Sequence, residues 1–579
     1  MTRDDGRSGP GSAPPFDLTV EPWLTVQLSA GGEQELSLRE VFAQADAIAR
    51  LSGDVPTQDF ALLRLLLAVL HDALKGPTDV EEWAELWESA DPFAAVPGYL
   101  DEHRKRFDLC HPATPFLQVA RLSNGKDETF PLNRLVADVP NGDPFFTTRF
   151  PGVDRLSFAE AARWLVHAHA YDTAGIKTGV LDDPRAKGGK AYPQGTAWAG
   201  MLGGVSAEGT SLKETLLLNL IATEDFPPPG RAPDLPAWRR EPDGPGEGDL
   251  RHRPTGLCDL YTWQSRRVRL QVDHEGVFGA LLTYGDPLVP RNQQKLEPMT
   301  GWRRSRAQEK KHGAQLVYMP REHDPERAAW RGLAALLGAE SRPQETGARG
   351  EPAEALQPGL VHWLARLRND GALSDETTVR FRTYGTMYGT QQSVVDEVVA
   401  DEVTMPVVLL GESSRRLGIC AVDAVAHADK AVDALGWLAH DLVLATVAND
   451  KRRVQGNDRT VAEISQDQIR DRAYGELDGH FRTWLAAIRP GDEVQELSTV
   501  WQRTVRRELL RLADELLAAA GDQAWTGRTV KLKDGGEQWI NSASAERRFR
   551  IALTKALPHT RPAPPAAVSD GATTSVRVD

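Results

Sequence analysis

The sequence contains few cysteines, and no two of them lie close together. Cys110, Cys258 and Cys420 are the three cysteines among 579 residues, and no CxxC pattern occurs. This spacing excludes a disulfide framework and a zinc site built from cysteines. It is typical of proteins in a reducing compartment, so we expect a cytoplasmic protein with no structural metal.

Long hydrophobic runs are also missing. No stretch of 18 or more apolar residues occurs, so no membrane-spanning helix and no membrane partner are expected. The first 15 residues, MTRDDGRSGPGSAPP, lack the apolar segment of a signal peptide and are expected to form a disordered tail.

The familiar motifs of nucleotide pockets and hydrolases are absent as well. Neither GxxxxGK[ST] nor a compact GxGxxG occurs, and there is no GxSxG or HExxH. Paired His and Asp residues leave one enzymatic alternative open, a metal-dependent phosphohydrolase of the HD type. Three groups could contribute to it: His71 with Asp72, His440 with Asp441, and His167 and His169 with Asp172. Their spacing forces no convergence, so we expect no enzyme and no cofactor.

Positive charge is not in excess either. Lys and Arg number 68 against 82 Asp and Glu, which gives a net charge of −14. Proteins that coat nucleic acid without specificity usually carry a basic balance. Contact with phosphates is therefore expected only through local patches, with partner molecules neutralising most of a nucleic-acid backbone.

The length and the helical periodicity predict two domains of the α+β class. Residues 16–405 mix segments of helical and strand character, and we expect them to form a large mixed α/β domain. Long amphipathic runs begin near Ile419 and continue over 465–488, 494–520 and 541–557. They predict a C-terminal four-helix bundle over 412–558, followed by a disordered tail at 559–579.

Local sequence patterns predict a helix and a segment of β-structure within the first domain. Residues 37–51 are predicted as a helix, because Ser37 and Glu40 have the spacing of a capping box. Residues 258–272 alternate in polarity and are expected to be rich in β-structure.

A stretch rich in glycine and cations runs from Tyr171 to Gly204. It holds eight glycines and four cations, Lys177, Arg185, Lys187 and Lys190. Glycine lets backbone N–H groups approach a partner closely, and adjacent lysines favour a partner that carries phosphate. The simpler interpretation, a long surface loop that needs glycine for its turns, remains open.

Other features that suit nucleic acid are spread over the chain. A basic patch lies near Trp302, Gln391 and Gln392 occupy a YGTQQS turn, and three arginines share one face of a predicted helix: Arg503, Arg507 and Arg511. Glutamine amides can hydrogen-bond base edges. Each feature also has a simpler interpretation as solvated surface, and Glu508 and Glu515 lie near the arginines.

Taken in order, these segments resemble one family, the large subunit (CasA family) of the type I-E CRISPR surveillance complex, Cascade. The resemblance covers Phe16 to about Pro558. It is carried by FDLTVEPWLTV, HPATPFLQV, the glycine-rich stretch running into SLKETLLLNLI, LPAWRREP, YTWQSRRVRL, YGTQQS and the terminal helical region.

The resemblance implies a non-catalytic subunit that recognises the protospacer-adjacent motif in double-stranded DNA and helps open the duplex for R-loop formation. It implies four kinds of partner: CRISPR guide RNA, target double-stranded DNA, the backbone and small subunits of Cascade, and the CRISPR helicase-nuclease. In such complexes base pairing reads the target, while protein reads a short motif and the duplex shape.

The resemblance also assigns residues. The family's glycine loop falls on AGIKTG, and hence on Gly175, Lys177, Thr178 and Gly179, where Lys177 could add a phosphate contact. The strand-separating wedge falls on Gln391 and Gln392, and the lysine finger falls within GDPLVPRNQQK, with Lys295 and Arg291 as candidates. The loop that meets guide RNA and a neighbouring subunit is expected in FFTTRFPGVDR, with Phe145, Phe146 and Arg149. The displaced strand would pass the Arg503–Arg511 face.

Overall fold

A computed structural model of the chain describes residues 14–126, 128–137, 152–230, 232–313, 316–337, 353–411, 413–446, 460–531 and 536–560. The chain divides into two compact units, residues 1–418 and 419–579. Helices and strands are mixed in the first unit, and the second is mainly helical, in agreement with the predicted class. No described helix is both long and apolar enough to cross a bilayer.

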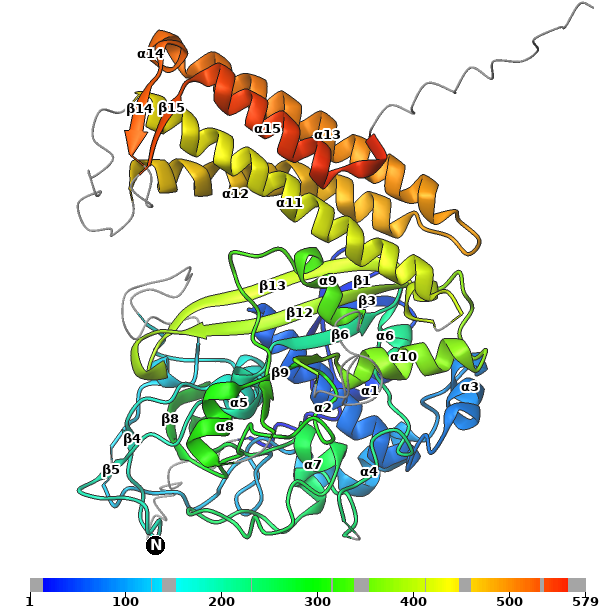
Figure 1. The fold of residues 1–579 in the computed structure, drawn as a ribbon. Coiled ribbons are helices and arrows are strands. Elements are labelled where there is room, and N and C mark those ends of the chain that lie inside the picture. The colour runs from blue at the N-terminus through cyan, green and yellow to red at the C-terminus, as the bar shows by residue number, and fades with distance from the viewer. Residues whose placement is uncertain are drawn as a thin grey trace, which may run out of the picture. The chain divides into compact units, whose positions relative to one another are not determined.

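The helices of the first unit surround one central helix, α2 (Pro56–Leu74), which is buried along nearly its whole length (Figure 1). Its sequence is apolar on almost all sides, and Pro56 at the first turn suits the start of a helix. It packs against α5 and α7. The other helices are α1 (Leu38–Ala43), α3 (Val80–Glu88), α4 (Val96–His103), α5 (Phe158–Tyr171), α6 (Leu212–Leu218), α7 (Leu257–Tyr261), α8 (Arg306–His312), α9 (Leu333–Leu336) and α10 (Gly359–Asn369).

The strands of the first unit form several small sheets. Two sheets have the orders β2-β1-β3 and β10-β9-β11, with β1 (Leu24–Leu28), β2 (Glu33–Leu36), β3 (Ile48–Leu51), β9 (Trp302–Arg304), β10 (Tyr318–Pro320) and β11 (Ala355–Leu356). Two pairs are β4 (Lys177–Thr178) with β5 (Lys190–Ala191), and β7 (Arg266–Asp273) with β8 (Gly276–Tyr284).

The longest strands form a hairpin that is central to the candidate site. β12 (Thr378–Tyr388) and β13 (Val395–Pro406) pair antiparallel from Thr378↔Pro406 to Tyr388↔Val395. β6 (Gly204–Glu208) pairs only with Arg380–Tyr384 of β12, so the described part of the hairpin beyond Tyr384 is a two-stranded ribbon. Figure 1 shows this long pair with β6 beside one part of it.

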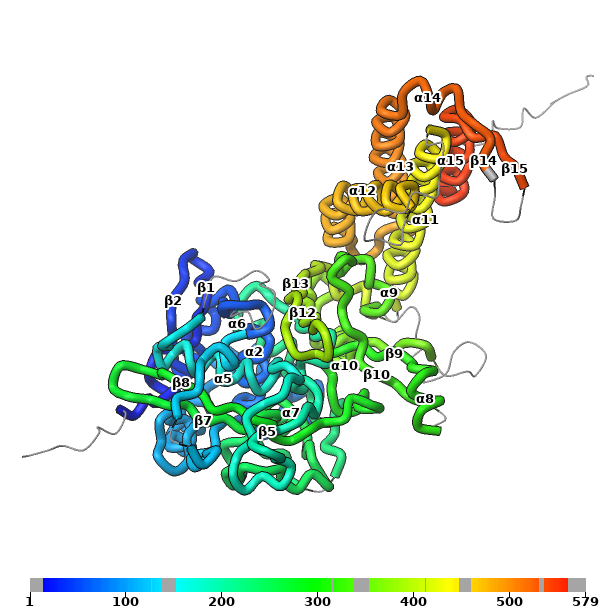
Figure 2. The backbone as a smooth tube through the Cα atoms, turned by 90° about the vertical axis from the view of Figure 1, so that its left-hand side faces the viewer, coloured from blue at the N-terminus to red at the C-terminus, as the bar shows by residue number. Residues whose placement is uncertain are grey.

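The second unit contains four long described helices, α11 (Arg415–Thr446), α12 (Val461–Ala486), α13 (Val494–Ala519) and α15 (Ser542–Ala556); α11 begins just before the division between the units. A short helix, α14 (Gly521–Thr526), and a strand pair, β14 (Arg528–Lys531) with β15 (Glu537–Ile540), lie between α13 and α15 (Figure 2). These additions were not part of the predicted bundle.

Aromatic residues hold the long helices of the second unit together. Trp501 of α13 is buried, lies edge-on to Phe481 of α12 at a centroid distance of 5.1 Å, and donates from Nε1 to the carbonyl of Ala424 on α11 at 2.9 Å. Asp441 of α11 forms an ion pair with Arg548 of α15 at 2.7 Å. Core contacts and ion pairs therefore link all four helices.

Two of the local predictions need correction. The capping box of Ser37 and Glu40 is confirmed, but α1 ends at Ala43 and residues 48–51 form strand β3, paired with β1. Pairing with a neighbouring strand outweighs local helix propensity there. Residues 257–261 form helix α7 instead of the expected β-structure, and only β7 follows the alternating pattern.

Candidate nucleic-acid interface

The tip of the β12–β13 hairpin exposes the two predicted glutamines. Gln391 and Gln392 lie in a short 3-10 turn, η6 (Thr390–Gln392), and both have φ of 55°. The turn is closed by hydrogen bonds from Gln392 N to Gly389 O at 2.8 Å and from Gly389 N to Val394 O at 3.1 Å. A Cβ atom on Gly389 would lie 2.4 Å from the carboxylate of Asp396, so a side chain there would require Asp396 to move.

The hairpin tip touches the predicted glycine loop, although more than 200 residues separate the two in sequence. The amide of Ala174 donates to the carbonyl of Gln392 at 2.7 Å. A Cβ atom on Gly175 would lie 3.5 Å from Cβ of Ser393. The structure therefore brings together the start of the glycine loop and the two glutamines.

Side chains from distant segments hold the carbonyl groups of this loop. Four donors reach residues 171–176: Tyr388 Oη to Tyr171 O at 2.6 Å, Arg266 Nη2 to Asp172 O at 2.9 Å and Thr173 O at 3.0 Å, Tyr284 Oη to Gly175 O at 2.9 Å, and Arg134 Nη1 to Ile176 O at 3.0 Å. A loop whose carbonyls are satisfied in this way has a fixed backbone path.

Lys177 is buried beneath the loop and is not available at the surface. Its side chain is 3% exposed, and its ammonium forms an ion pair with Asp172 at 2.5 Å. Arg266 also pairs with Asp172. Because a buried, paired ammonium cannot reach a phosphate in this conformation, the predicted phosphate contact of Lys177 is not supported; the residue supports the loop from within.

The electrostatics of this group follow from two cations sharing one carboxylate. The pKa of Lys177 falls from 10.5 to about 8, mainly because the ammonium is buried; Asp172 opposes this fall and Arg266 contributes to it. Burial alone would raise the pKa of Asp172, but Lys177 and Arg266 together bring it below its ordinary value. The shift falls on the pKa of Lys177 because the guanidinium of Arg266 stays charged.

The rest of the glycine-rich stretch forms a small hairpin. Thr178 lies in β4, and Gly188 and Gly189 have φ of 57° and 71° in the turn that leads to β5. A Cβ atom on Gly179 would lie 2.7 Å from backbone atoms of Gly189 and Lys190. These glycines therefore serve the close approach of two strands.

A cavity of about 290 Å³ adjoins the loop and the hairpin. It is lined by residues 133–137, by residues between 171 and 177, and by Ser393–Val395. Its walls combine apolar side chains with charged groups already described.

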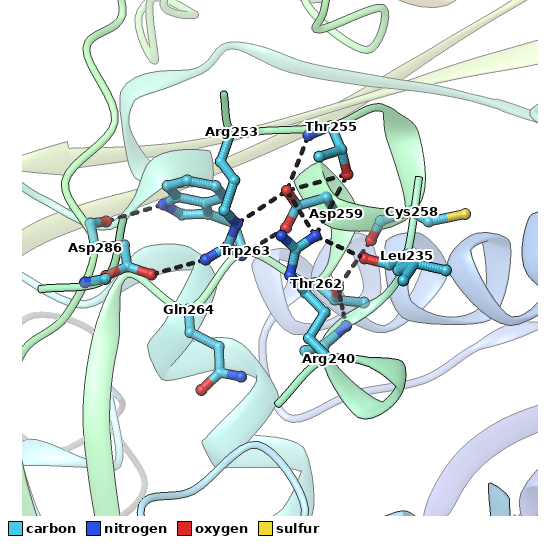
Figure 3. Close-up of polar contacts among 12 residues, drawn as sticks. Leu235, Arg240, Arg253, Thr255, Cys258, Asp259, Thr262, Trp263, Gln264 and Asp286 are labelled. Carbon is cyan, nitrogen blue, oxygen red and sulfur yellow. Dashed lines mark hydrogen bonds and ion pairs between the residues drawn. The ribbon is translucent and has the colours of Figure 1, made fainter. Parts of the chain in front are cut away.

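The segment with the two lysine-finger candidates is held at both ends by buried carboxylates. Asp286 accepts from Arg267 at 2.6 Å and Arg253 at 3.3 Å, and Figure 3 shows Arg253 between Asp286 and Asp259. Glu297 accepts hydrogen bonds from both terminal nitrogens of Arg64, each at 2.9 Å. Between these anchors Lys295 is exposed and Arg291 is partly buried.

The arginine face of α13 was predicted as a basic surface, but acidic residues pair with part of it. Arg503, Arg507 and Arg511 are exposed on one helix, but Arg507 pairs with Glu508 at 2.8 Å. Arg511 pairs with three carboxylates, those of Glu476 at 3.1 Å, Glu508 at 3.3 Å and Glu515 at 2.7 Å. Neighbouring acids thus neutralise two of the three arginines.

Acidic neighbours also neutralise part of the basic patch near Trp302. Arg304 pairs with Glu309 at 2.7 Å, and Arg306 pairs with Glu354 at 2.5 Å. The guide-docking candidates Phe145, Phe146 and Arg149 lie outside the described residues.

The His–Asp groups are engaged in structural contacts. Asp72 accepts from Tyr99 at 2.5 Å and Arg239 at 2.6 Å, His167 Nε2 lies 2.9 Å from Thr57 Oγ1, and His169 Nε2 lies 2.9 Å from Leu117 O. His71 and Thr57 sit near opposite ends of α2, about 20 Å apart at the usual helical rise. Within the described residues, no three His, Cys, Asp or Glu side chains gather as a metal site would require.

Several supporting residues were missed by sequence reasoning. Arg266 is the first residue of β7, and Tyr284 and Tyr388 are the last residues of β8 and β12. Each contacts loop residues that lie more than 90 positions away in the sequence. Strand character is visible in the alternating segment YTWQSRRVRL and before the YGTQQS turn. No local pattern shows which loop the polar side chains of these strands will contact.

Comparison with known proteins gives consistent matches. The family model "CRISPR-associated protein Cse1" matches residues 17–512. The CRISPR-associated protein CasA/Cse1 of Thermus thermophilus is 32% identical over 387 residues, which span 64% of this chain and 70% of that protein.

Solved structures agree over almost the whole length. The crystal structure of Thermobifida fusca Cse1 has a TM-score of 0.84 and 52% identity, covering 94% of this chain and 99% of the other. Cse1 from Acidimicrobium ferrooxidans has a TM-score of 0.78 and 31% identity, covering 95% and 99%. A chain of a CRISPR RNA-guided surveillance complex shares the fold, with a TM-score of 0.59 at 20% identity, covering 88% of this chain and 100% of the other.

The family model spans most of the chain, and the Thermobifida fusca structure matches it nearly end to end. The resemblance seen in the sequence is thus confirmed, and this chain belongs to the Cse1 (CasA) family of CRISPR-associated proteins.

Proposed function

We propose that this protein is the non-catalytic large subunit of a type I-E Cascade complex. In this role it recognises the protospacer-adjacent motif in double-stranded DNA, helps open the duplex, and supports recruitment of the helicase-nuclease. The observation that carries the proposal is the contact of the hairpin tip with the glycine loop, through Ala174 N and Gln392 O at 2.7 Å. Family membership supports the same role.

The geometry suits a protein that recognises a short motif in duplex DNA and separates the strands beside it. Exposed amides of Gln391 and Gln392 project from a turn whose backbone is closed by hydrogen bonds, so they can enter between strands without first ordering the turn. The adjacent loop has a fixed backbone path, which suits close approach to the minor groove of DNA. Gly175 and Thr178 belong to this reading surface, while the buried Gly179 lets the strands beneath it approach and Lys177 supports it from below.

The remaining assignments complete the proposal. Lys295 or Arg291, on the segment anchored at Asp286 and Glu297, contacts a backbone phosphate. The loop with Phe145, Phe146 and Arg149 docks guide RNA and a neighbouring backbone subunit. The C-terminal helices pack as a four-helix bundle against the small subunits, and Arg503 is the member of its arginine face for which phosphate contact is proposed.

The test is reconstitution of the complex with guide RNA and partner subunits, followed by binding to duplexes that differ only in the adjacent motif. Because both glutamines have positive φ, which glycine adopts readily, substitution by glycine removes their side chains while the turn can keep its backbone conformation. The double variant Gln391→Gly with Gln392→Gly is expected to assemble normally and to lose at least about tenfold in duplex opening, a cost of ~1.4 kcal/mol.

A conservative pair provides the matched control. Asparagine tolerates positive φ and keeps an amide, so Gln391→Asn with Gln392→Asn should retain more opening than the glycine pair. Binding by the unmodified complex that does not depend on the motif would contradict the proposed function.

A further inference from the structure

The hairpin tip and the glycine loop are joined by a second hydrogen bond that lies behind the surface. Tyr388, the last residue of β12, sends its hydroxyl to the carbonyl of Tyr171, the last residue of α5, at 2.6 Å. The carbonyl groups in the last turn of a helix have no partner within the helix. Tyr388 therefore satisfies an end of α5 that would otherwise lack a donor.

Neighbouring residues are shaped around this tyrosine. A Cβ atom on Gly200 would lie 2.1 Å from Tyr388 Oη and 3.0 Å from its ring carbon Cζ. Gly200 sits in η3 (Trp198–Met201) with no positive φ, so its lack of a side chain is explained by space and not by backbone conformation. Burial raises the pKa of Tyr388 well above its ordinary value, so the hydroxyl remains a donor.

Near its tip the described part of the hairpin has no third strand beside it. β6 pairs with β12 only as far as Tyr384, and beyond that point the described ladder consists of β12 and β13 alone. A two-stranded ribbon twists more freely than a sheet. The bonds of Tyr388 and Gln392 to the segment 171–174 therefore help to fix the position of the tip, beside the side chains of Thr386 and Val395, which share a small pocket with Tyr171.

Resting on the proposed function, we propose that Tyr388 is a positioning residue that couples the Gln391–Gln392 wedge to the glycine loop, so that motif reading and strand separation occur in one fixed geometry. Tyr388 does not itself touch DNA. It sets the distance between two elements that do.

The chain offers a matched control on the same strand. Tyr384 is a buried tyrosine of β12, whereas Tyr388 is partly buried, and the Tyr384 hydroxyl lies 3.1 Å from Ser206 Oγ on β6, away from the loop. Tyr384→Phe and Tyr388→Phe each remove one hydroxyl from one strand. The difference between them isolates the bond to Tyr171.

The experiment measures, in the reconstituted complex, affinity for a motif-bearing duplex, a duplex without the motif, and a duplex already unpaired next to the motif. Tyr388→Phe is expected to lower the ratio of the first two affinities about threefold to tenfold, as loss of one buried hydrogen bond allows. It should bind the unpaired duplex as the unmodified complex does. Tyr384→Phe should keep the original ratio.

A second variant guards against damage to the fold. Gly200→Ala keeps the hydroxyl but displaces the Tyr388 ring, and it should reproduce the lowered ratio. The inference is overturned if either variant keeps the original ratio, or if binding to the unpaired duplex falls equally. Failure of the proposed function looks different, because the unmodified complex would then show no preference for the motif.

Discussion

At the scale of single residues, the site depends on one carboxylate serving two cations. Asp172 pairs with Lys177 and Arg266, and all three side chains are at least 93% buried. This small cluster carries a net positive charge away from water, so the cation that can lose its proton does so more readily. Lys177 therefore connects the stability of the loop to pH.

The first prediction concerns this pH dependence. The folded pKa of Lys177 is about 8 and its ordinary value is 10.5, so between these values the unfolded chain holds a proton that the folded chain has released. Raising the pH through this window must favour the folded state. From pH 7.5 to 9.5, the free energy of unfolding of the unmodified protein should rise by about 2 kcal/mol relative to Lys177→Met. Urea unfolding at each pH measures it.

Lys190→Met controls for loss of a positive charge, because Lys190 is exposed on the partner strand β5. Its curve should run parallel to that of the unmodified protein. Parallel curves for Lys177→Met as well would refute the assignment of the buried charge.

The role of Lys177 also shows the limit of prediction from sequence at this scale. Glycines beside a lysine suggested a phosphate contact, and Asp172 was visible five positions away. Arg266 and Tyr284, which close the site around that lysine, lie 94 and 109 positions from the loop residues that they contact. Only the tertiary fold decides whether a cation in such a loop points outward or is buried with a partner.

At the scale of elements, caps and apolar spacing determine where helices begin. The capping boxes at Ser37, Ser157 and Thr460 each start a helix, and the long helices α12, α13 and α15 begin and end within a few residues of their predicted limits. Short elements were less predictable. Residues 48–51 and 257–261 are too brief for periodicity to decide, and their contacts with β1 and α2 settle their conformation.

The second prediction concerns the cap of α12. Thr460 Oγ1 accepts a hydrogen bond from the amide of Glu463, and the amide of Thr460 donates to the Glu463 carboxylate at 2.9 Å. Thr460→Ala should lower the stability of the second unit by about 1 kcal/mol, while Thr460→Ser should nearly preserve it. Hydrogen exchange of the α12 amides provides the measurement.

Thr499→Ala offers a comparison at a threonine within helix α13, where Thr499 Oγ1 donates to Gln495 O at 2.7 Å. It should cost little, because alanine favours a helix interior. An equal loss for both threonine variants would argue against the capping role.

At the scale of the whole molecule, two units have separate cores. Buried tryptophans occur in both, with Trp164 on α5 in the first unit and Trp501 on α13 in the second. The sequence indicated this division through a change from mixed patterns to long helical ones. The sheet pairings within the first unit, between strands as distant as β6 and β12, had no comparable local signal.

The third prediction follows from the separate cores. Trp501→Ala should destabilise the second unit by about 3–5 kcal/mol and leave amide protection in α2 unchanged. Trp164→Ala should do the reverse, with protection lost in α2 and α5 and retained in α13. Hydrogen exchange read by mass spectrometry distinguishes the units, and loss of protection in both units for either variant would contradict separate cores.

The bond between Tyr388 and the end of α5 has a mechanical consequence. A force that pushes on Gln391 and Gln392 along the ribbon would bend an unsupported two-stranded arm. Here it passes through Tyr388 and the Ala174 amide into α5, which packs on the buried helix α2. The arm is braced near its loaded end, so a load on the tip is shared between the two strands and the packed interior of the unit.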